Sequence, residues 1–227
     1  MQSMAQENNL SETAFFVPKD NGFHIRWFTP TSEVDLCGHA TLASAYVLFN
    51  LLGYEKDKIE FDSRSGMLAV AKNNEWLIMD FPAQPPVSCD IPKEIIKAFD
   101  TVPIECLKSE DYIVVFKRET DIKLAQPDFE QLKKLDLRGV IITAKSSRYD
   151  FIARFFAPKF GVPEDPVTGS AYTQLAPYWA SRIGPKRFNV KQVSSRGGEL
   201  SCEMVDDRVF ISGKAIKYLE GKIKIKT

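Results

Sequence analysis

The stretch Arg26-Trp27-Phe28-Thr29-Pro30 recurs as Arg154-Phe155-Phe156-Ala157-Pro158, 128 residues later in the chain. Each copy follows a segment of strand-like apolar composition and leads through a polar loop into a step of small residues. That step is Gly38-His39-Ala40 in the first half and Gly169-Ser170-Ala171 in the second, an offset of 131 residues. Because a repeated sequence pattern marks a repeated structural unit, the chain is predicted to contain one module twice.

Three further landmarks recur in the same order: a glycine after an apolar segment, a turn that contains Ser-Arg, and a polar hairpin. They are Gly53 and Gly184, Ser63–Leu68 and Ser195–Leu200, and Asn73-Asn74 and Asp206-Asp207. The alternative is a chance likeness among strand-rich segments. The constant order of the landmarks favours an internal duplication.

Each module is predicted to run strand, loop, helix, strand, hairpin, strand. The segment Gly38–Leu52 is apolar on nearly every face, which is typical of a helix buried on all sides. Its counterpart is Ser170–Ile183, and a glycine follows each helix as a left-handed stop. Strands are expected at Glu75–Phe81, Tyr112–Phe116, Val140–Ala144 and Arg208–Ser212. The predicted fold class is α+β, with two pseudo-symmetric domains that each wrap a mostly antiparallel, barrel-like sheet around a central buried helix.

Prolines concentrate between the two modules, in residues 82–92, which is typical of a linker. We therefore expect an N-terminal repeat domain in residues 1–90 and a C-terminal repeat domain in residues 91–227. The tail after Gly213 has strand character. Residues 215–227 could return to the first domain, and the pattern leaves open which half they join.

The composition is that of an ordinary globular protein. The chain has 227 residues, 44% of them hydrophobic, with 30 basic and 30 acidic side chains. Apolar residues are plentiful enough to offset the entropy lost on ordering, so disorder is excluded as the main state. A net charge of zero argues against a nucleic-acid-binding protein. No apolar run approaches the roughly 20 residues that cross a bilayer, and the polar start predicts a cytoplasmic protein that does not bind membranes.

The cysteines and the catalytic motifs narrow the chemistry. Cys37, Cys89, Cys106 and Cys202 show no CxxC spacing, so reduced thiols are expected, without disulfide or metal roles. The chain has no Walker loop, no GxGxxG after a strand, no HExxH and no GxSxG. Nucleotide, dinucleotide, zinc-protease and serine-hydrolase functions therefore have no support in the sequence.

Two like modules that meet face to face can direct both helix N-termini into one cleft. Free backbone N–H groups and the positive ends of the helix dipoles then make an anion site suited to a substrate carboxylate. The glycines at Gly38 and Gly169 allow a ligand to approach the backbone closely. The alternative is that the small residues serve only as ordinary helix starts.

The differences between the modules point to acid/base chemistry. Aligning Thr13-Ala14 with Thr143-Ala144 sets Glu12 against Ile142, so an acid stands where the copy has a core residue. A carboxyl group withdrawn from water generally ionises closer to neutral pH, where a general acid or base works best. The alternative is an edge-strand glutamate that faces water.

Two more polar residues lie at the predicted helix starts. His39 aligns with Ser170, and the second loop adds Glu164-Asp165-Pro166 before its helix. A histidine at a glycine-opened helix start is a candidate for proton transfer or for a hydrogen bond to substrate. A structural histidine, and a turn-capping role for Asp165, are the alternatives.

Five motifs follow one another across nearly the whole chain. They are Asn8–Phe15, Arg26–Pro30, Asp35–Thr41, Glu164–Ala171 and Ser195–Gly198. Together they resemble the PhzF family of phenazine biosynthesis-like isomerases. The resemblance implies the diaminopimelate epimerase fold, with two similar domains and the site between them.

The resemblance also implies a reaction. The family consists of homodimeric isomerases that work without a cofactor and transfer a proton on a small carboxylated substrate, so we expect the same of this chain. In the phenazine enzyme the substrate is trans-2,3-dihydro-3-hydroxyanthranilate, and a glutamate moves a proton along an allylic system. The residues that match the polar groups of that site are Glu12, His39, Asp165 and Ser170. The backbone expected to hold the carboxylate belongs to Gly38, Ala40, Gly169 and Ala171.

Two features depart from the family pattern. Family members carry a further N-terminal segment with a first strand and an Asn-Pro-Ala-Ala stretch that lines the site, whereas this sequence begins within the following helix. The family also often has histidine after Gly-Ser-Ala, where this chain has Tyr172.

The sequence leaves three functions open. The first is the isomerase with Glu12 as acid/base. The second is an amino-acid epimerase that uses a thiol pair, which is disfavoured because the counterpart of Cys37 is Thr168. The third is a non-catalytic binding protein of the same fold with an incomplete site.

Overall fold

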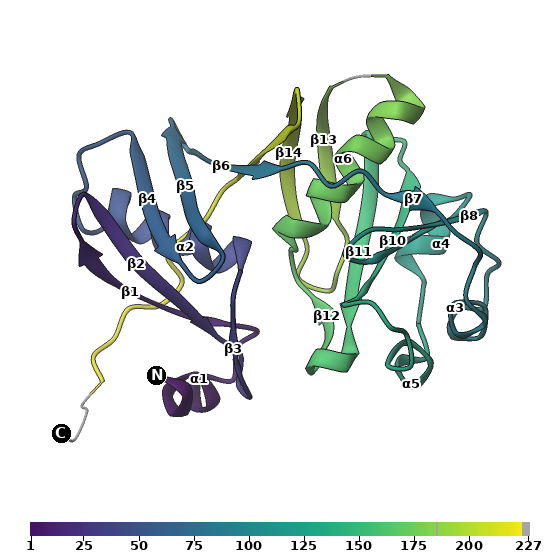
Figure 1. Ribbon diagram of the computed structural model, residues 1–227, viewed down its shortest axis with the longest axis horizontal. Helices are drawn as coiled ribbons and strands as arrows, with labels where there is room; N and C mark the ends of the chain where they lie inside the picture. Colours follow the sequence, from purple (N-terminus) through teal and green to yellow (C-terminus); the bar gives the residue numbers. More distant parts are fainter. Residues whose placement is uncertain (185, 224–227) are drawn as a thin grey trace.

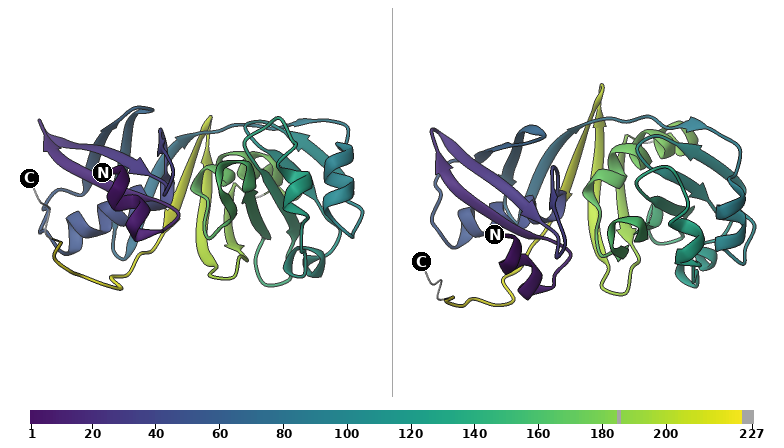
Figure 2. Two further views of the ribbon diagram at one scale, coloured as in Figure 1. Left: turned by 90° about the horizontal axis from the view of Figure 1, so that it is seen from below. Right: turned by 60° about the horizontal axis from the view of Figure 1, so that its bottom comes forward.

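The computed structural model describes residues 1–184 and 186–223 (Figure 1). Within this part of the chain, 15 strands join one sheet in the order β1-β2-β4-β5-β6-β15-β14-β13-β11-β10-β9-β8-β7, with β3 on β2 and β12 on β11. The sheet curls into two lobes, each with a central helix, and β6 and β15 pair where the lobes meet (Figures 1 and 2). The α+β class is confirmed, and each lobe has a central helix as expected.

The first lobe contains two helices and six strands. They are α1 (Gln2–Asn8), β1 (Thr13–Lys19), β2 (Gly22–Phe28), β3 (Glu33–Val34), α2 (Gly38–Asn50), β4 (Lys58–Ser63), β5 (Gly66–Asn73) and β6 (Trp76–Pro82).

The second lobe repeats this order after three extra strands and three short helices. Those extra elements are β7 (Val87–Ser88), α3 (Lys93–Ala98), β8 (Glu105–Lys108), β9 (Tyr112–Val115), α4 (Glu119–Lys123) and α5 (Phe129–Leu132). The repeated part is β10 (Val140–Lys145), β11 (Phe151–Ala157), a 3-10 turn (Pro158–Phe160), β12 (Val162–Asp165), α6 (Gly169–Ile183), β13 (Arg187–Gln192), β14 (Gly198–Val205) and β15 (Arg208–Gly213).

In the repeated part of the chain, the strand pairings of the two lobes correspond. β1 pairs antiparallel with β2, and β10 with β11, while β2 pairs parallel with β4, and β11 with β13. Antiparallel hairpins follow in both lobes, and their turns use Asn74 and Asp206 at φ 55° and 53°. Gly53 and Gly184 adopt φ 69° and 89°, as a left-handed helix stop requires. This correspondence fits a duplicated module, whose evolutionary origin stays a prediction.

In the part of the chain that the structure describes, the second lobe has strands at its outer edge that the first lobe lacks. In the second lobe β9 pairs parallel with β10, and β8 then pairs with β9. Within the described residues of the first lobe, β1 pairs with β2 alone. The second lobe accordingly has an additional apolar cluster, which contains Ile95, Phe116 and Phe156.

The expectation that the first helix is buried on all sides is wrong. Ala40, Ala45 and Leu48 of α2 are buried, but Ala43 and Asn50 are exposed. The exposed side faces open space instead of a sheet: Ala43 lines a cavity between the lobes.

The tail was also expected to be a strand, and residues 214–223 form neither helix nor strand. Lys214 pairs with Glu75 at 2.7 Å and Ala215 packs on the main core, so the tail starts along the first lobe. Ile216, Tyr218 and Leu219 are more than 80% exposed. The expectation for residues 224–227 lies outside the described residues.

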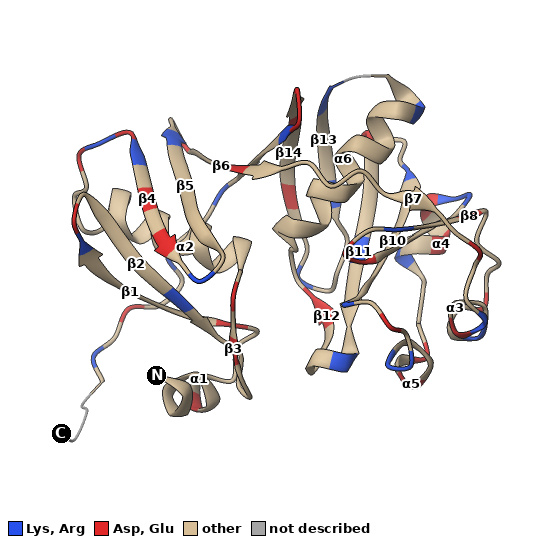
Figure 3. Ribbon diagram, viewed as in Figure 1, with Lys and Arg blue, Asp and Glu red and all other residues tan. Residues whose placement is uncertain are grey.

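The main core continues through both lobes. It includes the buried side chains of Trp27 and Phe61 in the first lobe and of Phe151 and Phe188 in the second. Each such side chain contributes about 1.5–3 kcal/mol when it leaves water. Acidic and basic residues are spread over both lobes (Figure 3). No helix in the described part of the chain is both long enough and apolar enough to traverse a bilayer.

Candidate active site

The N-termini of α2 and α6 meet between the lobes. A methyl group added to Gly38 would lie 3.5 Å from the Cα of Gly169, and one added to Gly169 would lie 3.6 Å from the Cα of Gly38. The first N–H groups of a helix have no partner within the helix, and the dipole makes this end positive. The two glycines therefore bring two sets of amide donors to one place, as the sequence predicted.

Glu12 and His39 lie beside these helix ends. Glu12 comes directly before β1, not within a strand as expected, and its side chain is 14% exposed. His39 is the second residue of α2, and its Nε2 lies 2.9 Å from Glu12 Oε2. The two atoms are not aligned for a hydrogen bond, and Glu12 Oε2 has no hydrogen-bond partner among the described residues. The carboxyl group is thus largely buried, and its Oε2 is available to a ligand.

The charge of His39 depends on its neighbours. Burial favours the neutral imidazole, but Cys37, the Glu12 carboxylate and Asp165 offset this and raise the pKa of His39 well above its usual 6.5. Because the ring then holds its proton near neutral pH, His39 can act as a proton donor or as a cation beside Glu12.

Asp165 lies close enough to His39 and Glu12 to interact with the charges of both. It ends β12 with 6% exposure, and its Oδ2 accepts a hydrogen bond from the Thr168 hydroxyl. Its Oδ1 is buried and has no partner in the described residues. Burial raises the pKa of Asp165, and Glu12 adds to the rise, while His39 opposes it. Asp165 therefore caps its turn and still has one oxygen free.

Ser170 is held by a polar network that the sequence did not reveal. Arg138 Nη2 donates to Ser170 Oγ at 3.0 Å, and its Nε and Nη2 donate to the Asp111 carboxylate at 2.9 and 2.6 Å. Gln174 Nε2 donates to the same carboxylate at 2.7 Å. Since a guanidinium only donates, the Ser170 hydroxyl accepts from it and keeps its own hydrogen for another acceptor.

The strand register corrects the alignment of Glu12 with Ile142. Phe15 pairs with Arg26 in the first lobe, and Ile142 pairs with Arg154 in the second. Because the two arginines are equivalent, Phe15 matches Ile142 and Glu12 matches Gly139. A side chain at Gly139 would meet the Phe155 ring at 2.6 Å, so the second lobe has no room for an acid there.

The residues before the helices are Cys37 and Thr168, as the sequence suggested. All four cysteines are free, and Cys37 is buried. Burial raises the pKa of the Cys37 thiol. Without a facing thiol, a two-cysteine mechanism lacks its second partner. Within the described residues, Glu12, Cys37 and His39 form the one group whose ligand atoms are close enough to hold a metal ion.

The remaining predicted residues contribute backbone only. Ala40 and Ala171 are 6% and 1% exposed, with their methyl groups in the core. The Ala171 N–H already donates to the Thr168 carbonyl at 3.2 Å. The amides nearest the helix ends, at Gly38 and Gly169, are therefore the better donors for a ligand.

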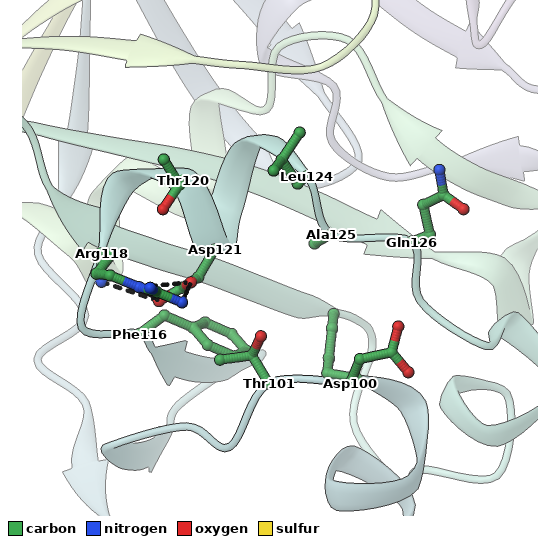
Figure 4. Close-up of a pocket in the computed structure, with 10 residues that line it drawn as sticks. Asp100, Thr101, Phe116, Arg118, Thr120, Asp121, Leu124, Ala125 and Gln126 are labelled. Atoms are coloured by element: carbon green, nitrogen blue, oxygen red, sulfur yellow. Dashed lines mark hydrogen bonds and ion pairs between the residues drawn. The ribbon is translucent and has the colours of Figure 1, made fainter.

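A cavity of about 560 Å³ opens from the site. His39 and Gly169 line it, together with apolar side chains that include Leu42 and Met79. A second cavity, of about 380 Å³, lies against α4 far from these residues in the chain (Figure 4). Arg118, which lines this cavity, forms an ion pair with Asp121 at 2.7 Å. Neither of these two side chains is therefore free to bind a charged ligand.

Comparison with known proteins identifies the family. The model of the family described as phenazine biosynthesis-like protein matches residues 1–221. The chain belongs to the phenazine biosynthesis-like family. A relative from Pseudomonas aeruginosa, named an uncharacterized isomerase, is 49% identical over 225 residues, which are 99% of this chain and 87% of the relative. A phenazine biosynthesis-like domain-containing protein from Rattus norvegicus is 39% identical, over 98% of this chain and 87% of its own.

Solved structures of the phenazine biosynthesis-like family agree with this fold. A PhzF family protein from Enterococcus faecalis has a TM-score of 0.96 and 44% identity, over 99% of this chain and 86% of its own. A probable proline racemase from Agrobacterium radiobacter has a TM-score of 0.65 at 8% identity, which is a likeness of fold alone. With its isomerase-named relatives, the chain is an enzyme of the isomerase type.

Proposed function

We propose that the protein is a cofactor-independent isomerase that moves a proton on a small carboxylated substrate, with Glu12 as the acid/base. The observation that carries the proposal is the largely buried Glu12 carboxyl group beside two helix N-termini. Its Oε2 makes no hydrogen bond within the described residues and lies 2.9 Å from His39 Nε2. The substrate carboxylate binds the amides at Gly38 and Gly169, where the helix dipoles favour a negative charge.

The proton transfer has a balanced form. Glu12 takes a proton from one carbon of the substrate, the electron pair shifts along the adjacent double bond, and Glu12 returns the proton to the far carbon. His39 and Asp165 orient the reacting part and relay protons, and the Ser170 hydroxyl donates to a substrate oxygen. Positioned groups of this kind contribute about 10²–10⁴-fold to a rate.

The remaining expectations belong to the same proposal. The protein works as a cytoplasmic homodimer, without nucleic acid or membrane partners. Its lobes act as domains 1–90 and 91–227 that arose by duplication. The residue Tyr172, where the family often has histidine, is fully buried, so we propose that it supports the core and does not touch the substrate.

The test is deuterium incorporation. Metal-free protein in D₂O is incubated with trans-2,3-dihydro-3-hydroxyanthranilate and a panel of small unsaturated and α-chiral carboxylates, and mass spectrometry follows the exchange. We expect deuterium at one carbon of at least one carboxylate. Binding of a carboxylate without exchange of any panel member would instead support a non-catalytic protein.

The thiol mechanism makes a different prediction in the same assay. A Cys37→Ala variant retains exchange within about tenfold if Glu12 is the base, and loses it if the thiol is. Racemisation of free amino acids by the parent protein would point to the thiol mechanism as well.

A further inference from the structure

Three different metal-ligating groups meet at the site. Cys37 Sγ lies 3.7 Å from His39 Nε2, which lies 2.9 Å from Glu12 Oε2, and all three donor atoms fall within 4.8 Å of one another. In a tetrahedral zinc centre, with Zn–S about 2.3 Å and Zn–N and Zn–O about 2.0 Å, neighbouring donors are about 3.3–3.5 Å apart. Small side-chain adjustments would bring the three donors to this spacing.

The cluster also contains a buried oxygen that no hydrogen bond in the described part of the chain satisfies. Glu12 Oε2 is buried and has no hydrogen-bond partner among the described residues. A thiolate from Cys37 and the carboxylate of Glu12 carry two negative charges, which a divalent cation neutralises. Buried charges in proteins are paired with an opposite charge or coordinate a metal, and here the cation would take the place of the His39 proton beside Glu12.

We propose that Glu12, Cys37 and His39 form an inhibitory binding site for a thiophilic divalent cation of the Zn²⁺ class. On binding, the cation displaces two protons to solvent, the thiol proton of Cys37 and the Nε2 proton of His39, and it accepts the sulfur, the freed Nε2 lone pair and one oxygen of Glu12. No electron is transferred. The inhibition, though not the binding, rests on the proposed function, because the cation occupies the oxygen that would carry the proton.

The donor set selects the class of ion, and the cavity gives it access. Sulfur and imidazole ligands suit zinc, cobalt and cadmium, whereas magnesium and calcium require oxygen ligands. The His39 side chain is 33% exposed and lines the 560 Å³ cavity, which leaves the fourth coordination position open to solvent or ligand. Such an open position distinguishes this site from a closed structural zinc site.

The chain provides its own control. Cys89 and Cys106 form another thiol pair, with Sγ atoms 3.7 Å apart, outside the active site. Cys89→Ser removes that pair and leaves the proposed site intact. Cys37→Ser removes the proposed site and leaves the pair.

The binding test uses cobalt as the spectroscopic probe for zinc. Metal-free full chain is titrated with CoCl₂, and the thiolate-to-cobalt charge-transfer band and the visible d–d bands are recorded. We expect one equivalent to bind in the parent and in Cys89→Ser, with release of up to two protons near neutral pH, from Cys37 and His39. Cys37→Ser should lose the charge-transfer band and bind cobalt at least about 10–100-fold more weakly. Losing a group that only supports a metal ligand already lowers metal affinity by this factor, and Cys37 would be a direct ligand.

Two results would overturn the site: a band that persists in Cys37→Ser and disappears in Cys89→Ser, or no band in the parent at millimolar cobalt. If Cys37→Ser fails to fold, as judged by near-ultraviolet circular dichroism, His39→Gln replaces it and should likewise weaken cobalt binding. Unchanged cobalt binding in folded His39→Gln would also contradict the proposal.

The inhibition test uses the deuterium assay. ZnCl₂ should stop exchange in the parent and in Cys89→Ser, a chelator should restore it, and Cys37→Ser should resist. Zinc-insensitive exchange in the parent would refute the inhibition. A cobalt signal in a protein that exchanges no carboxylate would sustain the metal site and count against the proposed function.

Discussion

Glu12 and His39 come from separate segments of the chain, and each side chain affects the protonation of the other. The loop before β1 supplies the carboxyl group of Glu12. The first turn of α2 supplies the imidazole of His39, whose Nε2 lies 2.9 Å from Glu12 Oε2. A cation beside a buried carboxylate lowers the cost of keeping that carboxylate charged. The pair can therefore hold one proton and exchange it with a substrate.

The protonation of His39 tests this coupling. Its raised pKa means that the folded protein binds the proton more tightly than the unfolded chain does. The resulting stability is fully present below pH about 6.5 and is lost as the pH rises through the raised pKa. In a ¹H–¹³C NMR titration we expect the His39 ring to titrate above 6.5, and Glu12→Gln to lower its pKa. Since the chain has two histidines, His39→Gln assigns the signal.

A midpoint of His39 at or below 6.5, or one that Glu12→Gln leaves unchanged, would contradict the coupling. In that case His39 would be a neutral hydrogen-bonding group.

Arg138 acts at the same scale as a positioning residue. Asp111 is fully buried and receives its charge compensation from Arg138. Removing one partner of a buried ion pair leaves the other charge uncompensated and costs about 3–5 kcal/mol. We expect Arg138→Met to lower the free energy of unfolding by about 3 kcal/mol in a urea titration.

The matched control is Arg118→Met. Arg118 pairs with Asp121 at 2.7 Å but is 68% exposed, so its loss should cost less than about 1 kcal/mol. Equal effects of the two substitutions would show that Asp111 does not depend on Arg138.

Some of these residues could be found from sequence and some could not. Glu12 and His39 belong to short motifs, and the spacing of the two modules placed the glycines together. Arg138 reaches Ser170 across 32 residues and Asp111 across 27. No local pattern reports such contacts, and only the strand register reveals that Arg138 precedes the equivalent of Glu12.

At the scale of elements, the close approach of α2 and α6 is the decisive feature. Both helices begin with glycine, and the two Cα atoms are near enough that any side chain would enter the space between the helix ends. The same space is where a substrate carboxylate would meet the amide groups.

Gly169→Ala should separate folding from binding. The added methyl group would lie 3.6 Å from Gly38 Cα and 3.7 Å from Met79 Cε, which are ordinary contact distances, so the melting temperature should hold. We expect KM for the exchanged carboxylate to rise about tenfold, or about 1.4 kcal/mol, because the methyl group occupies the ligand position. Gly221→Ala, which meets nothing within 4 Å, is the control. An unchanged KM would place the carboxylate elsewhere.

Element boundaries were largely predictable, and two of the wrong expectations share a cause. The helix Gly38–Asn50 and strands such as Trp76–Pro82 follow from periodicity and turn residues. Apolar composition predicts burial on all sides for α2 and strand formation for residues 215–223. In both cases the apolar side chains face a cavity or solvent, which composition alone does not distinguish.

At the scale of the whole molecule, one core connects the two lobes. β6 pairs with β15 over six residues, and the same apolar cluster contains Trp27 and Trp179. The repeat in sequence predicted two like units, but it could not report that their sheets join, because strand pairing across the junction links residues more than 120 positions apart.

This continuity predicts cooperative unfolding. Circular dichroism and tryptophan fluorescence should give one coincident thermal transition, since Trp27 and Trp76 report on the first lobe and Trp179 on the second. A Trp179→Phe variant should show the same midpoint by both probes after correction for its own stability change. Two separate transitions would mean that the lobes unfold independently.

The role of Glu12 is tested most directly by Glu12→Gln, which keeps the shape of the side chain and removes its charge. With the carboxylate that the parent exchanges in D₂O, we predict at least a 100-fold loss of deuterium incorporation, in line with the about 10²–10⁴-fold contribution of a positioned acid/base. Isothermal titration should show that the variant still binds the same carboxylate. Exchange at the parent rate in Glu12→Gln would contradict the account.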